Sequence, residues 1–91
     1  MIEWSIGAEQ QLHELRQLFN TEAARKRFDK QLDAILKQLE DFPESARVHP
    51  ILNRQDVRAF LVAEYRLTVL LLEDRTLVFS IVHAKSGAGF D

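Results

Sequence analysis

The residues that decide the fold are 57–84, VRAFLVAEYRLTVLLLEDRTLVFSIVHA. This stretch is dense in β-branched, leucine and aromatic residues, which favour strands. It is interrupted only at 63–64 and at 73–75, and both interruptions are short enough to be turns. The sequence therefore predicts three consecutive strands that form an antiparallel meander.

The residues before the meander are predicted to cover one face of its sheet. Residues 2–6 alternate apolar and polar side chains, which indicates a short first strand with Trp4 as a core anchor. Apolar residues then recur at helical spacing over 8–19 and over about 22–41. Asn20 and Thr21 favour the start of the second helix, and Pro43 prevents its continuation, so a helical hairpin is expected. Residues 44–56 lack periodicity and are predicted to be a loop.

Length and composition favour one small domain spanning residues 1–91. The chain has 91 residues, of which 46% are hydrophobic, and it has no cysteine, so disulfides, thiolate zinc sites and thiol nucleophiles are excluded. No apolar run approaches the roughly 20 residues that span a bilayer, and the N-terminal residues do not have the pattern of a signal peptide. We expect a cytoplasmic protein that does not bind membranes. The predicted fold class is α+β: an N-terminal strand, an α-helical hairpin, and a three-stranded antiparallel meander.

Charge and glycine content exclude several classes of site. The net charge is −2, which disfavours general binding to nucleic acids because their affinity depends on Lys and Arg. The three glycines, Gly7, Gly87 and Gly89, form no phosphate-binding loop. Asp29 and Asp33 lie four residues apart on a helix, but lysines alternate with them, which is typical of a solvated face. We expect neither a cofactor nor a metal ion.

Alternation within the second strand of the meander separates two faces. Tyr65, Leu67, Val69 and Leu71 fall on one face, and Arg66, Thr68, Leu70 and Leu72 fall on the other. Two helices cover only one face, so we assign the Tyr65 face to the core and the Arg66 face to solvent or a partner.

The same alternation in the last strand places Leu77, Phe79 and Ile81 inward. Thr76, Val78, Ser80, Val82 and Ala84 are then expected on the open face. His83 falls on the inward side near the strand end, where a structural and a catalytic role are both open. An apolar sheet face rimmed by arginines is typical of a surface that a protein partner covers.

The order of these elements resembles the RelE/ParE superfamily of type II toxin–antitoxin toxins. The resemblance rests on Phe42-Pro43 after the hairpin, on the segments 56–60 (DVRAF) and 65–69 (YRLTV), and on 78–85 (VFSIVHAK). It implies helices on one face of a curved antiparallel sheet and a cognate antitoxin that wraps the toxin. The valine-arginine pair at 57–58 and the ending of the last strand are closer to the ParE branch.

The two branches imply different activities. ParE-like toxins inhibit DNA gyrase, whereas RelE-like toxins cut mRNA on the ribosome. In a nuclease of the second kind, Arg66 and Lys85 would bind phosphate, and His83 would be the general acid or base. Ser86 stands where the nuclease branch has a further arginine, and the remaining tail has no tyrosine. The resemblance therefore favours a non-enzymatic, plasmid-stabilising toxin.

The predicted partner-binding residues lie on the open face and around it. They are Arg54, Arg58, Arg66, Thr68, Ser80 and Lys85. Residues from about 86 to 91 are expected to be a flexible tail. The alternatives that stay open are a ribosome-dependent mRNA endonuclease and a non-toxic binding module of the same fold, and a homodimer is a further hypothesis.

Overall fold

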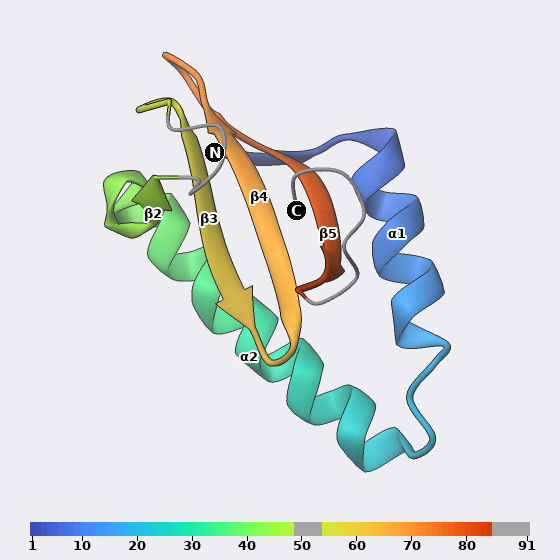
Figure 1. Cartoon of the computed structure of the whole chain (residues 1–91). Helices are drawn as coiled ribbons and strands as arrows, with labels where there is room; N and C mark the ends of the chain where they lie inside the picture. Colours follow the sequence, from blue (N-terminus) through green and yellow to red (C-terminus); the bar gives the residue numbers. More distant parts are fainter. Residues whose placement is uncertain (49–53, 85–91) are drawn as a thin grey trace.

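A single five-stranded sheet with two helices behind it forms the fold in the computed structural model, which describes residues 1–48 and 54–84 (Figure 1). In chain order the elements are β1 (Ile2–Trp4), α1 (Ile6–Arg16), α2 (Glu22–Asp41), the 3₁₀ turn η1 (Pro43–Ser45), β2 (Arg47–Val48), β3 (Val57–Val62), β4 (Tyr65–Leu71) and β5 (Thr76–His83). The predicted α+β fold class and the three strands of the meander are confirmed.

The strands lie in the order β1-β5-β4-β3-β2. The meander β3-β4-β5 is antiparallel, and β1 pairs with β5 in parallel. Parallel neighbours need a long connection, and the connection between β1 and β5 includes both helices. The strand β2 was not predicted, since it lies in the segment interpreted as a loop. With two residues, it is too short to show any periodicity.

Side-chain caps set the first turns of both helices. The Ser5 hydroxyl accepts from the Ala8 amide at 3.1 Å, and the Thr21 hydroxyl accepts from the Ala24 amide at 3.1 Å. The second helix spans the predicted residues. The first helix ends at Arg16 instead of continuing to 19, and Leu18, which was expected in its buried stripe, is 73% exposed.

The core lies between the helices and one face of the sheet. Figure 1 shows α2 crossing behind β3 and β4, while α1 runs beside β5. The helices contribute Leu15, Phe28, Leu32 and Leu39, and the sheet contributes Val62, Leu67, Val69, Val78 and Ile81. Trp4 packs against this cluster, as the alternation of residues 2–6 predicts.

A β-bulge reverses the predicted faces in the first half of β5. Thr68 pairs with Ser80, but the next residue, Val69, pairs with Val78, so Phe79 is an extra residue without a partner on β4. Residues before Phe79 are therefore shifted by one position relative to a regular ladder. Val78 and Thr76 are buried at 0% and 4% exposure.

The assignment of β5 is thus wrong before the bulge and correct after it. Leu77 and Phe79 were expected in the core and lie outside the core cluster, whereas Val78 belongs to it. Beyond the bulge, Ile81 is in the core. Val82 pairs with Arg66 and therefore lies on the open face.

Candidate functional site

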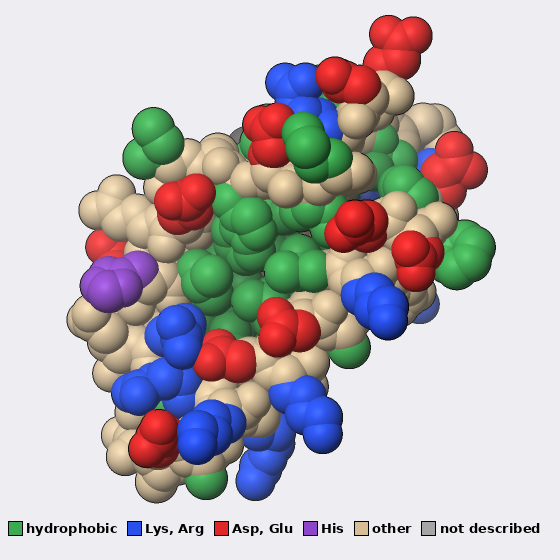
Figure 2. Space-filling view, turned by 180° about the vertical axis from the view of Figure 1, so that it is seen from behind, with side chains coloured by type: hydrophobic (Ala, Val, Ile, Leu, Met, Phe, Trp, Pro, Cys, Tyr) green, Lys and Arg blue, Asp and Glu red, His purple; other side chains and the backbone are tan. Residues whose placement is uncertain are grey.

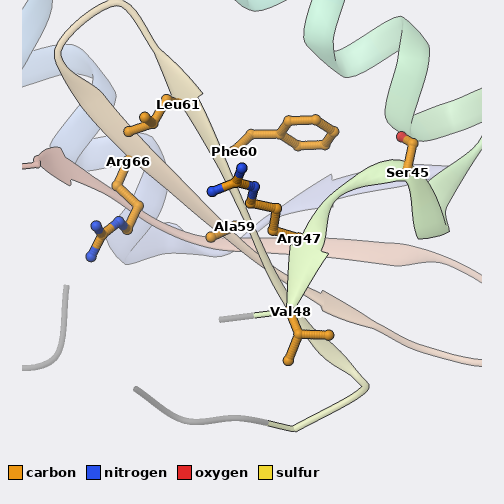
Figure 3. A pocket seen from close by; sticks show the side chains of 7 residues that line it. All are labelled: Ser45, Arg47, Val48, Ala59, Phe60, Leu61 and Arg66. Atoms are coloured by element: carbon orange, nitrogen blue, oxygen red, sulfur yellow. The ribbon is translucent and has the colours of Figure 1, made fainter. Parts of the chain in front are cut away.

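A cleft of about 570 Å³ lies on the open side of the sheet, where β2 meets β3 (Figure 3). Its lining residues come from three strands and the turn before β2: Ser45, Arg47, Val48, Ala59, Phe60, Leu61 and Arg66. Arg47 reaches the cleft from β2 and Arg66 reaches it from β4. Leu61 and Phe60 point to opposite sides of β3, as alternate strand residues must.

Strand register explains why these side chains meet. Ala59 pairs with Arg47 on one side and with Thr68 on the other, and Leu61 pairs with Arg66. Directly opposed residues share a face, so the two arginines stand on the face that the helices do not cover. Leu61 lies on the same face and is 63% exposed.

Both arginines of the cleft are available to a ligand. Within residues 1–48 and 54–84, neither Arg47 nor Arg66 forms a hydrogen bond or an ion pair with another side chain or the backbone. A guanidinium carries five N–H donors in a planar fork that matches a carboxylate or a phosphate. The cleft therefore offers two cations beside an exposed leucine.

Of the predicted partner-binding residues that the structure describes, Arg66 is the one that lines this cleft. Thr68 and Ser80 pair with each other on the same face, as predicted, but they are buried at 0% and 8% exposure. The Thr68 hydroxyl has no hydrogen-bond partner among the described residues. In this structure neither side chain is presented at the surface.

The structure does not bring Arg54 and Arg58 together with Arg66. Arg54 forms a bidentate pair with Asp56, with N–O distances of 3.0 and 2.7 Å. Arg58 pairs with Val69, a core residue, and therefore lies on the helix side of the sheet.

Arg58 binds the backbone of its surroundings. It donates to the carbonyl oxygens of Gln55, Glu44 and Ala46 at 2.7, 3.1 and 3.0 Å. These contacts tie η1 and the start of β2 to the start of β3.

His83 and Arg66 lie on opposite faces of the sheet. His83 pairs with Tyr65, and the two rings are in edge contact with centroids 5.5 Å apart. Tyr65 in turn contacts Phe28, so His83 is the last of three adjacent rings at the rim of the core. The Nε2 atom of His83 lies 3.5 Å from a Glu64 carboxylate oxygen. The inward position predicted for His83 is confirmed. Lys85, the third member of the predicted nuclease set, lies outside the described residues.

A second hollow lies on the helix side, between α1 and α2. It has a volume of about 340 Å³, and its apolar lining consists of Trp4, Leu12, Leu32 and Leu36. Figure 2 shows hydrophobic side chains gathered in the middle of this side with charged residues around them. An ion pair of 2.7 Å between Arg16 and Asp29 joins the two helices at its rim.

The sequence interpretation missed Arg47 and Leu61. A signal for Leu61 was present: the two-residue turn at 63–64 pairs 62 with 65 and therefore places residue 61 opposite Arg66. Counting back along both strands from the same turn places Arg58 opposite Val69, on the core side. For Arg47 the sequence contains no such signal, because β2 is too short.

The described part of the chain contains neither a metal-ligand cluster nor a membrane-spanning helix. No group of three or more His, Cys, Asp or Glu side chains is placed to hold a metal ion. None of the helices in the described ranges is both long and apolar enough to cross a membrane.

The fold and the cleft define a small α+β protein whose open sheet face carries two arginines, with no histidine beside them among residues 1–48 and 54–84. Residues 2–86 match the family model described as ParE toxin of type II toxin-antitoxin system, parDE, and the chain therefore belongs to that family. The resemblance to the RelE/ParE superfamily, and to its ParE branch, is confirmed. The protein is a toxin of a type II toxin–antitoxin system. A search of curated proteins gives no significant match.

Proposed function

We propose that this toxin acts without catalysis, by binding a protein target such as DNA gyrase through the open face of its sheet, and that a cognate antitoxin neutralises it in the cytoplasm. The observation that carries the proposal is the cleft at β2 and β3, where Arg47 and Arg66 have no partner among the described residues and flank the exposed Leu61. Cations beside an exposed apolar side chain suit a protein surface.

The positions of Arg66 and His83 support binding over RNA cleavage. A general acid or base must come within hydrogen-bond reach of the proton that it transfers. Arg66 shares its face with Leu61 and Val82, while His83 packs on Tyr65 at the rim of the core on the other face. A phosphate held by Arg66 is thus separated from His83 by the sheet.

Induced expression in a bacterial host tests the proposal. Wild-type protein is expected to arrest growth or division, and Arg66→Glu is expected to relieve the arrest because it reverses the charge of the cleft. Lys26→Glu is the matched control: it makes the same charge change on α2, where Lys26 is 77% exposed, and it is expected to stay toxic. Normal growth with the wild-type protein at full expression would contradict the proposal.

A ribosome-dependent cleavage assay separates the proposed activity from the nuclease alternative. We expect no cut mRNA with the wild-type protein. Cleavage that is lost in both Arg66→Ala and His83→Ala would overturn the non-catalytic proposal, since only a nuclease needs both residues for the same step.

A further inference from the structure

Two shallow hollows lie next to each other at one end of the molecule, where α2 ends and β4 turns into β5 (Figure 1). Their volumes are about 380 and 210 Å³, and Pro43, Leu71 and Leu72 line both of them. Phe42 lines the larger hollow and is 68% exposed. Met1 lines the smaller hollow and is 70% exposed. Neighbouring apolar side chains that are exposed within a polar rim mark a surface for a partner.

Carboxylates surround this apolar surface. Figure 2 shows acidic side chains gathered at its upper right, with hydrophobic side chains between them. The carboxylates that line the two hollows are those of Glu40, Asp41, Glu44, Glu73 and Asp74. Within residues 1–48 and 54–84, Asp74 is the member of this set that has an ion-pair partner, Arg75.

The guanidinium groups at this end are already bound. Arg75 pairs with Glu3 and Asp74 at 3.3 and 3.1 Å. Arg58 reaches the Glu44 carbonyl, but it directs its N–H groups to backbone oxygens and to a glutamine side chain. The amino group of Met1 adds one positive charge at the smaller hollow. The charges that lack a partner in the described part of the chain are therefore mostly negative.

Folding does not explain the carboxylates at the end of α2. Glu40 and Asp41 lie in the last turn of this helix, which contains no basic residue. The C-terminus of a helix carries a partial negative charge, so carboxylates there disfavour the helix. A basic group of a partner would offset both the two carboxylates and the helix dipole.

Hydrogen bonds fix the backbone on both sides of the larger hollow. The Phe42 amide donates to the Gln38 carbonyl at 2.7 Å. The Phe42 carbonyl accepts from the amide and the hydroxyl of Ser45 at 3.0 and 2.7 Å. On the other side, the Leu72 amide donates to the Arg75 carbonyl at 2.9 Å. Because the backbone is already ordered, binding here has a smaller entropic cost.

This surface adjoins the cleft that contains Arg47 and Arg66. Ser45 lines both the cleft and the larger hollow, so one partner can cover the two. The cleft offers cations and the hollows offer carboxylates. A partner that covers both must therefore present acidic groups beside basic ones.

We propose that the hollows at the end of α2 bind a segment of the toxin's target in which Lys or Arg side chains flank an apolar or aromatic residue. The apolar residue packs on Phe42, Pro43 and Leu72, and the basic side chains bind the carboxylates of Asp41 and Glu44. The identity of the partner rests on the proposed function, whereas the chemistry of the segment does not.

The charge of the surface separates this ligand from other classes. Nucleic acids and anionic membranes are negative, like the unpaired side chains around the hollows. A metal ion is disfavoured as well, since no three of the described His, Cys, Asp and Glu side chains are placed to hold one. A basic segment with an apolar anchor matches both the rim and the floor.

Peptide selection on the whole chain tests this inference. Random short peptides displayed on phage are selected in parallel on the wild type, on Asp41→Asn/Glu44→Gln and on Phe42→Ala. The matched control, Glu9→Gln/Glu14→Gln, removes the same charge from exposed side chains of α1. Peptides with Lys or Arg around an apolar residue are expected on the wild type and on the control.

The two test variants are expected to bind the selected peptides more weakly. Asp41→Asn/Glu44→Gln is expected to lose about fivefold in affinity, because exposed ion pairs contribute little each. Phe42→Ala is expected to lose about tenfold, the cost of truncating an aromatic anchor. Far-UV circular dichroism checks that each variant is folded, and Asp41→Asn alone or Phe42→Leu replaces one that is not.

Two further measurements on a selected peptide locate the site. Its binding is expected to shift the amide signals of Phe42 and Leu72 in a ¹⁵N–¹H spectrum. Added salt is expected to weaken the binding, since it screens exposed charges. Peptides without basic residues, equal affinity of Asp41→Asn/Glu44→Gln and the control, or shifts at Leu61 or Trp4 in place of Phe42 would each overturn the inference. Self-association of the wild type that Phe42→Ala abolishes would do so too, because a second copy would then occupy the surface.

The growth assay and the peptide selection fail independently. Phe42→Ala and Asp41→Asn/Glu44→Gln are expected to relieve the growth arrest, while the control Glu9→Gln/Glu14→Gln stays toxic. Unchanged arrest in both test variants would overturn the target as the partner. Peptide binding at Phe42 by a protein that does not arrest growth would contradict the proposed function and support the basic segment as the ligand. Growth arrest with no basic peptide selected would do the reverse.

Discussion

The arginines of this chain differ in what they bind, although they share one residue type. Arg54 pairs with a neighbouring carboxylate, Arg58 binds three backbone carbonyls, and Arg66 is unpartnered among the described residues. The sequence interpretation grouped all three as partner-binding residues. The register of β3 on β4 separates Arg58 from Arg66, because it places Arg58 with the core and Arg66 in the cleft.

We predict that Arg58→Ala lowers the free energy of unfolding by about 2 kcal/mol, since hydrogen bonds from a charged donor are each worth roughly 1.5–3 kcal/mol and partial replacement by water recovers some of that. Urea denaturation followed by circular dichroism measures the change. Arg54→Ala removes an exposed ion pair and is expected to cost less than about 1 kcal/mol. Equal losses in the two variants would show that Arg58 has no special structural role.

The buried hydroxyl of Thr68 is expected to lower the stability of the fold. Its side chain is 0% exposed, and its hydroxyl has no partner in the described part of the chain. Thr68→Val replaces an unsatisfied buried hydroxyl with a methyl group of similar size, so we expect the free energy of unfolding to rise by about 1 kcal/mol. Thr68→Ala leaves a cavity in place of the methyl group and is expected to lower it. A loss of stability in the valine variant would mean that the hydroxyl is bonded after all.

The elements follow from local sequence wherever their pattern is long and regular. The helix α2 and the meander have the predicted bounds because their apolar periodicity extends over many residues and their turns contain recognisable breaks. The faces of β5 could be predicted only beyond the bulge. Residues 76–82 are almost all apolar or β-branched, and nothing among them marks Phe79 as an extra residue.

The site was harder to predict than the fold because part of it, like the bulge, has no pattern in the local sequence. Arg66 could be found because it interrupts an apolar strand. Arg47 could not be found, since it belongs to a strand of two residues that only tertiary pairing with Ala59 creates. The expected flexible tail after residue 85 and the role of Lys85 remain predictions, as both lie outside the described residues.

The turn between β3 and β4 contains a residue in a left-handed backbone conformation. Ala63 has a φ angle of 55°, in the left-handed region that costs a residue with a Cβ about 1–2 kcal/mol. We expect Ala63→Gly to raise the midpoint of urea denaturation, by about 0.5–1 kcal/mol in free energy. Ala34→Gly, on the exposed side of α2, is expected to lower stability by about 1 kcal/mol. A decrease in both variants would contradict the observed turn.

The whole molecule has two faces with separate tasks. The helix side buries the core, and its residual hollow is narrow and rimmed by the ion pair of Arg16 and Asp29. The open side carries the cleft with Arg47, Leu61 and Arg66. Under the proposed function, these two arginines, which have no partner among the described residues, bind the target of the toxin.

Inhibition of DNA gyrase supercoiling by the purified protein tests whether this toxin acts through the open face of its sheet. We predict that the wild type inhibits supercoiling and that Lys26→Glu and His83→Ala inhibit it at similar concentrations. Arg66→Ala is expected to need a concentration higher by about tenfold or more, because one charge-assisted contact is lost. Equal inhibition by Arg66→Ala and the wild type, with both proteins folded, would contradict the claim that the open face of the sheet is where this toxin acts.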